Sequence, residues 1–72
     1  MTSEEIKDAM LTFKPVKYKG MTFKRIIAYI YRVVETSHGK YKTIMQCELL
    51  DKNENSVVVA ESEKVELIEN GN

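Results

Sequence analysis

Apolar and polar residues follow two different periods along the chain. In residues 2–13 apolar side chains recur every three to four positions, which predicts an amphipathic helix. Thr2 and Glu5 have the spacing of a capping box, and Pro15 ends the helical pattern. After Pro15 apolar residues alternate with polar ones, and this period of two predicts β-strands.

The alternating part of the sequence predicts five strands separated by short polar or glycine-containing segments. They cover residues 16–19, 21–35, 40–50, 56–60 and 65–68. The two long strands form a predicted hairpin around the loop Thr36–Gly39, because Gly39 readily adopts the positive φ of a tight turn.

The register of this hairpin decides which side chains share a face. With Glu35 opposite Lys40, one face is almost entirely apolar. That face contains Ile26, Ala28, Ile30 and Val34 opposite Leu49, Cys47, Met45 and Tyr41. The other face is mixed, with Ile27, Tyr29, Tyr31 and Val33 among Lys42, Ile44, Gln46 and Glu48. The mixed face is too apolar for ordinary solvent surface, so we expect the helix, a ligand or a second copy to cover it.

One helix followed by short, long, long, short and very short strands resembles an SH3-like or Tudor-like small barrel with an added N-terminal helix. The resemblance spans Val16–Ile68 and rests on strand order and strand length. It implies a mainly β fold, with a five-stranded antiparallel barrel over residues 16–68. The chain is then a single domain of residues 1–72, with 69–72 as a tail. Barrels of this kind bind RNA, DNA, nucleotides, peptides or proteins, so the resemblance selects no ligand.

The 72 residues suffice for one small core but carry little chemistry. One Cys and one His exclude an internal disulfide and the common zinc sites. His38 lies in a predicted turn, and Cys47 is expected to be a buried, unreactive thiol. The glycines are isolated, so no phosphate-binding loop is present. We therefore expect no catalytic residue, no metal and no cofactor, and a protein that is not an enzyme.

The sequence contains no predicted targeting or membrane segment. The N-terminus is acidic, and the longest apolar run, Ile26–Tyr31, is far shorter than the ~20 residues needed to cross a bilayer. These features, together with the single Cys, predict a cytoplasmic protein without a membrane partner.

The formal net charge of zero conceals a separation of charge along the chain. Residues 14–42 contain eight Lys and Arg but one acidic residue, and they also contain all four tyrosines. Residues 43–72 contain seven acidic residues and two lysines. The chain is therefore expected to be strongly polar in its charge distribution.

The basic, tyrosine-rich segment predicts that the chain binds or sequesters an anionic ligand, either a nucleotide or a nucleic acid. Phosphates pair with Lys and Arg, and bases stack on Tyr. The predicted binding residues are Lys24, Arg25, Tyr29, Tyr31, Arg32, Lys40 and Lys42. In size and character the chain resembles phage-encoded antagonists of bacterial defence, some of which sequester nucleotide messengers while others block a host protein. Alternating lysines are also the ordinary solvent face of an antiparallel sheet.

The alternative function is a protein–protein interaction module or inhibitor that acts through the half-apolar mixed face. Separated charge also favours self-association, so we expect a homo-oligomer. Its predicted interface consists of Ile27, Tyr29, Tyr31 and Ile44.

Overall fold

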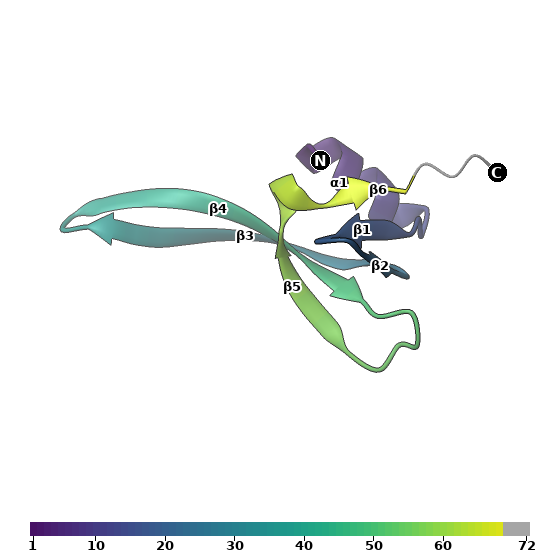
Figure 1. The fold of residues 1–72 in the computed structure, drawn as a ribbon. Coiled ribbons are helices and arrows are strands. Elements are labelled where there is room, and N and C mark those ends of the chain that lie inside the picture. Colours follow the sequence, from purple (N-terminus) through teal and green to yellow (C-terminus); the bar gives the residue numbers. More distant parts are fainter. Residues whose placement is uncertain (69–72) are drawn as a thin grey trace.

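A computed structural model describes residues 1–68 as one α-helix, six strands and one short 3₁₀ helix (Figure 1). In chain order these are α1 (Ser3–Leu11), β1 (Val16–Tyr18), β2 (Met21–Phe23), β3 (Arg25–Ser37), β4 (Lys40–Leu50), β5 (Val57–Glu61), η1 (Ser62–Lys64) and β6 (Glu66–Leu67). The predicted tail, residues 69–72, lies outside the described residues.

The strands form two separate antiparallel sheets, in the orders β2–β1–β6 and β3–β4–β5. The predicted mainly β fold with an N-terminal helix is confirmed, whereas the five-stranded SH3-like barrel is not, since the described residues form no closed barrel. The segment predicted as one strand, residues 21–35, belongs to both sheets. Its chain leaves the first sheet after Phe23, and the Lys24 N–H donates to the Leu50 carbonyl at 2.8 Å, which starts the second sheet.

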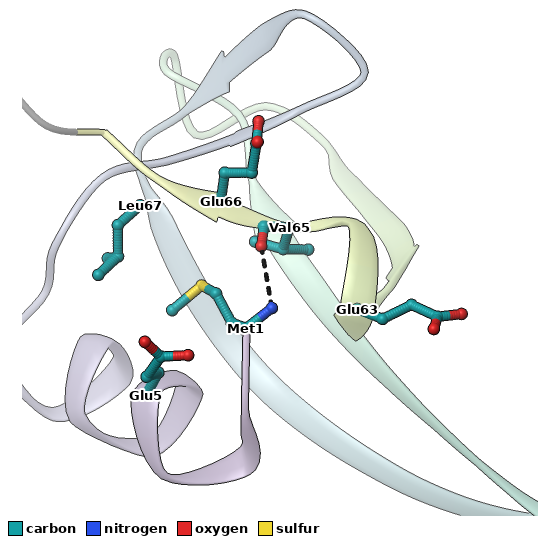
Figure 2. A pocket seen from close by; sticks show the side chains of 6 residues that line it. All are labelled: Met1, Glu5, Glu63, Val65, Glu66 and Leu67. Carbon is teal, nitrogen blue, oxygen red and sulfur yellow. Dashed lines mark hydrogen bonds between the residues drawn. The ribbon is translucent and has the colours of Figure 1, made fainter.

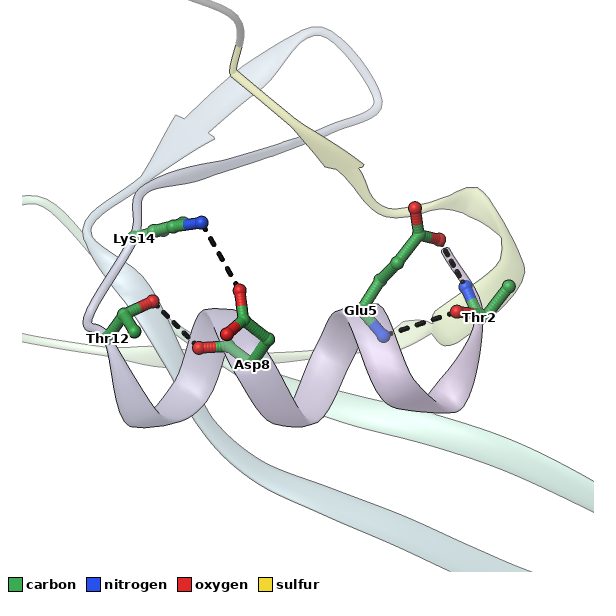
Figure 3. Close-up of polar contacts among 5 residues, drawn as sticks. All are labelled: Thr2, Glu5, Asp8, Thr12 and Lys14. Atoms are coloured by element: carbon green, nitrogen blue, oxygen red, sulfur yellow. Dashed lines mark hydrogen bonds and ion pairs between the residues drawn. The ribbon is translucent and has the colours of Figure 1, made fainter.

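Helix α1 begins at the predicted capping box (Figure 3). The Thr2 N–H donates to the Glu5 carboxylate at 2.8 Å, and the Glu5 N–H donates to the Thr2 hydroxyl at 3.2 Å. These bonds hold the pKa of Glu5 below its ordinary value, because the donors favour the charged carboxylate. The sequence therefore determines the start of this helix locally.

The helix ends at Leu11, earlier than the predicted end at Phe13. Phe13 adopts the left-handed conformation with φ of 55°, and the Lys14 N–H donates to the Ala9 carbonyl at 3.0 Å. This is a Schellman motif, in which glycine is the usual left-handed residue. The predicted apolar stripe is accordingly buried at Ile6 and Ala9, whereas Phe13 is exposed.

The core lies where α1 and the first sheet cover the base of the β3–β4–β5 sheet. The fully or nearly buried apolar side chains are Ile6, Ala9, Val16, Tyr18, Phe23, Ile26, Cys47, Leu49, Ala60 and Val65. Cys47 is thus buried as predicted. Residues of α1 and of β1 to β5, together with Val65, contribute to this one cluster, so residues 1–68 share a single small core.

A β-bulge at Ile27 changes the register of the β3–β4 hairpin. Ile26 pairs with Leu49 as predicted, but from Ala28 onward each partner differs by one residue from the prediction. Glu35 therefore faces Tyr41 instead of Lys40, and the predicted division into an apolar and a mixed face is wrong beyond the bulge. A bulge inserts an extra residue and reverses the alternation, so Ile26 and Tyr29 share the face of Leu49 and Cys47.

The β1–β2 turn supplies a test of local backbone strain. Lys19 and Gly20 have φ of 51° and 77°, as a two-residue turn with two left-handed residues requires. Asn tolerates this conformation better than Lys. We expect Lys19→Asn to raise the free energy of unfolding by roughly 0.5 kcal/mol in urea titrations. Lys17→Asn, at an extended position in β1, should give no gain, and equal effects of the two changes would contradict the strain argument.

Candidate functional site

The β3–β4 hairpin continues beyond β5 as a two-stranded projection (Figure 1). The last β4–β5 pair joins Gln46 to Glu61, so no third strand of the described part of the chain lies beside residues 31–45. We call these residues the hairpin arm. The described chain is 49 Å long but only 25 × 21 Å across. A two-stranded ribbon is marginally stable in water by itself, so the surface of this arm is the first candidate for a binding site.

One face of the arm is apolar and aromatic. Cross-strand pairs join Tyr31 to Met45, Val33 to Thr43, and Glu35 to Tyr41. We call this the tyrosine face, and its members are Tyr31, Val33, Glu35, Tyr41, Thr43 and Met45. Its four large apolar side chains are between 42% and 66% exposed. Such a contiguous exposed apolar stripe on a small chain indicates a surface that another molecule covers.

The opposite face of the arm carries the cations. We call it the basic face, and its members are Arg32, Val34, Lys40, Lys42 and Ile44. The Arg32 Nε–H donates to the Gln46 side-chain oxygen at 3.1 Å, so this guanidinium has a polar partner within the chain. Among residues 1–68 neither Lys40 nor Lys42 forms an ion pair. Their charges are therefore available to a partner molecule.

The arm is anchored to the core at Met45. The Ser62 hydroxyl, which is buried, donates to the Met45 carbonyl at 2.9 Å. The Tyr29 hydroxyl also donates to the Met45 sulfur. Tyr29 itself packs against the core cluster. These contacts fix the direction in which the arm leaves the rest of the chain.

The tip of the arm is a tight turn between β3 and β4. Gly39 has φ of 73°, and its N–H donates to the Glu35 carboxylate at 3.1 Å. The acceptor is the only acidic side chain of the arm, so its charge is engaged at the turn while the lysines remain free in this part of the chain.

The structure does not bring the seven predicted binding residues together. Lys24 and Arg25 lie at the base of the sheet, where Lys24 forms an ion pair with Glu54 and the Arg25 guanidinium lies 4.9 Å from the Phe13 ring centre. Arg25 and Lys40 are separated by the length of β3, about 40 Å at 3.3 Å per residue. Of the others, Tyr29 is half-buried, Tyr31 lies on the tyrosine face, and Arg32, Lys40 and Lys42 lie on the basic face. No single small ligand can contact all seven.

The four predicted interface residues also do not form one surface. Ile27 lies at the bulge, Tyr29 and Tyr31 project on one side of the hairpin, and Ile44 projects on the other. The bulge is the reason, because it separates residues that an unbroken register would place together.

A cavity that the sequence did not reveal lies between α1 and β6 (Figure 2). It has a volume of about 380 Å³ and is lined by Met1, Glu5, Glu63, Val65, Glu66 and Leu67. The Met1 ammonium group donates to the Val65 carbonyl at 3.4 Å at its edge. Three of the lining residues are glutamates, whose negative charges oppose a phosphate group, so the cavity does not suit the predicted anionic ligand.

The described residues show no further sign of a metal site or of a membrane-spanning helix. Among residues 1–68 no group of three His, Cys, Asp or Glu side chains is placed to hold a metal ion. In the same range no helix combines the length and the apolar character needed to span a membrane. No protein-family model, curated protein or solved structure matches the chain. The candidate site is therefore defined by its geometry alone.

Burial makes the Cys47 thiol a reporter of the core beneath the arm. Loss of solvation raises the pKa of Cys47 above its ordinary value, so the reactive thiolate is scarce at neutral pH. We expect a thiol-specific reagent to label the folded chain at a rate that follows unfolding in urea. A Thr43→Cys substitution in a Cys47→Ala chain places a thiol on the exposed arm and should react at once. Rapid labelling of Cys47 in the folded chain would contradict its position in the core.

The ion pair of Lys24 with Glu54 predicts a pH dependence. The hydrogen bond and the charge of Lys24 lower the pKa of Glu54. A lowered pKa contributes stability that is present above the unfolded-state pKa and is lost as the pH falls through the folded-state value. We expect Lys24→Met to raise the pKa of Glu54 toward its ordinary value in an NMR titration. Lys52→Met removes a lysine of the same turn and should leave the Glu54 titration unchanged; an unaltered pKa in Lys24→Met would show that this lysine is not the partner.

Proposed function

We propose that the chain is a non-catalytic interaction module whose hairpin arm binds a protein partner through the tyrosine face. The single observation that carries this proposal is the exposure of Tyr31, Val33, Tyr41 and Met45 on one face of a ribbon that no other element among residues 1–68 covers. Covering these side chains on binding removes apolar surface from water, which favours association.

The chemistry of the tyrosine face suits a protein surface better than a small ligand. Tyr and Met are enriched in the centres of protein interfaces, whereas Lys and Glu are depleted there. The tyrosine face has both of the former, and its one carboxylate, Glu35, is engaged by the turn. The arm also presents its residues along an extended ribbon and not around a cavity, which supports recognition of a groove or a sheet edge on the partner.

The net charge of the arm indicates which charges the surface of a partner would carry. The arm has three positive charges, at Arg32, Lys40 and Lys42, and one negative charge, at Glu35. The arm is therefore net positive, while the whole chain is neutral. A partner with an apolar groove bordered by acidic side chains would match this pattern. Such charge complementarity mainly raises the association rate and makes it sensitive to salt.

A nucleic acid single strand is a second candidate for the arm, in keeping with the predicted anionic ligand. The observation that favours it is the exposure of Tyr31 and Tyr41 on one face, with lysines on the other. Bases stack on such tyrosines, and phosphates follow the cations. A mononucleotide is less favoured because the seven predicted residues are spread along β3 and β4. Neither candidate depends on an SH3-like barrel or on a phage origin.

The binding test compares two double variants. Tyr31→Ser with Tyr41→Ser removes both aromatic rings of the arm, and Leu11→Ser with Met21→Ser removes two exposed apolar side chains elsewhere, 80% and 60% exposed. We expect the arm variant to lose at least about tenfold in affinity for a captured protein partner, since aromatic side chains dominate interface energies. The control variant should bind as the unaltered chain does.

The same variants separate the two candidates. Fluorescence anisotropy with a labelled single-stranded oligonucleotide, at low and high salt, tests nucleic acid binding directly. Salt-sensitive binding that the arm variant alone loses would favour the nucleic acid. Equal protein capture by both variants, with unchanged circular dichroism, would remove the arm as the binding element.

A further inference from the structure

The outer edge of β5 is a second uncovered feature, and it is separate from the arm. β5 is the last strand of the β3–β4–β5 sheet, and no other strand among residues 1–68 pairs with its outer edge. Figure 1 shows β5 at the margin of the fold, on the opposite side of β4 from β3. Its pairing with β4 runs from Val57 to Glu61 without a register shift, so the edge is regular. A regular open edge has unpaired backbone N–H and C=O groups that can accept a further strand.

Apart from Glu61 at its end, β5 lacks the charged and proline residues that usually protect such an edge. Natural edge strands carry lysines, prolines or bulges that prevent pairing with another chain. Residues 55–60 contain no charged residue and no proline. Val57, Val58 and Val59 are 36–50% exposed, although valine is among the residues that most favour strands. This edge is therefore suited to strand addition.

We propose that β5 pairs in antiparallel fashion with β5 of a second copy of the chain, around a two-fold axis at Val58. In this register Val58 faces itself, Val57 faces Val59, and Asn55 faces Glu61. The two three-stranded sheets then form one continuous sheet. A contact of this kind uses the same surface on both copies and closes on itself, as two-fold dimers do.

Charge and side-chain matching favour a second copy in this register. The edge can shift only in steps of two residues, because successive residues of a strand direct their backbone N–H and C=O groups to opposite edges. A shift of two residues in one direction places Val57 opposite itself and Asn55 opposite Val59, and a shift in the other direction places Val57 opposite Glu61, so both lose valine–valine contacts. The net charge of the chain is zero, so two copies do not repel each other as wholes. The apolar residues of β5, flanked by polar residues, are therefore matched best by β5 of a second copy.

This proposal stands apart from partner binding by the arm. It uses neither the tyrosine face nor the basic face, so the arm remains exposed in the dimer. The earlier prediction of a homo-oligomer placed the interface on the long hairpin at Ile27, Tyr29, Tyr31 and Ile44. The β5 edge offers a surface that those residues do not share.

Sedimentation equilibrium from micromolar to millimolar concentration tests the proposal on the full chain. We expect a reversible dimer of the unaltered chain, and a dimer dissociation constant at least about tenfold higher in Val58→Lys, because two like charges would meet at the axis. Val59→Lys, at the most exposed of the three valines, gives the same test where Val58→Lys fails to fold. Val33→Lys makes the same change on the arm and should leave the dimer intact.

The alternative outcomes are distinct. A monomer at every concentration, or a dimer lost in Val33→Lys and kept in both β5 variants, would overturn the proposal. NMR shifts confined to β5 when an unrelated extended peptide is added to a monomeric chain would show a different occupant and overturn it as well. Partner binding by the arm should persist in Val58→Lys, so failure of the dimer and failure of the arm's function are separable.

Discussion

The structure depends on burial of one face of the β3–β4–β5 sheet at its base. Ile26 and Leu49 face each other there and are fully buried beneath Ile6 of α1 and its neighbours. Residues 1–68 provide only one α-helix and three very short strands with which to cover this sheet. β3 and β4 are longer than this cover, so their far ends are exposed on both faces. The arm thus follows from strand lengths that exceed the size of the core.

The bulge at Ile27 determines which side chains lie on each face of the hairpin arm. It keeps Ile26 in the core and then turns Tyr29, Tyr31 and Val33 toward the side of Cys47. Without the extra residue, Ile30 and Val34 would lie on that side instead. The aromatic side chains are consequently separated from the cations Arg32 and Lys42, and the arm has one face for apolar contact and one for charge.

Local signals in the sequence predicted the structure well, and long-range ones did not. The capping box at Thr2 and the turn at Gly39 depend on neighbouring residues, and both are observed. The break at Lys24 and the bulge at Ile27 depend on what packs against the strands, which a pattern of period two does not report. The same limit explains the candidate site, because the expected register placed Tyr31 on the mixed face and Tyr41 on the apolar face, whereas the bulge brings both onto one exposed face.

The arm and the β5 edge expose different parts of the chain, and this difference separates the functions that we propose for them. The arm offers side chains, whose identity selects a partner. The edge at Val57–Glu61 offers mainly backbone groups, which accept any extended strand of compatible shape and charge. Because such an edge selects its partner only weakly, it promotes aggregation with other chains unless one partner strand is always present to pair with it. A second copy meets that requirement, since it is present wherever the chain is and matches the edge residue by residue. Pairing there would leave two identical arms free, and a partner with two sites would then bind more tightly than either arm alone allows.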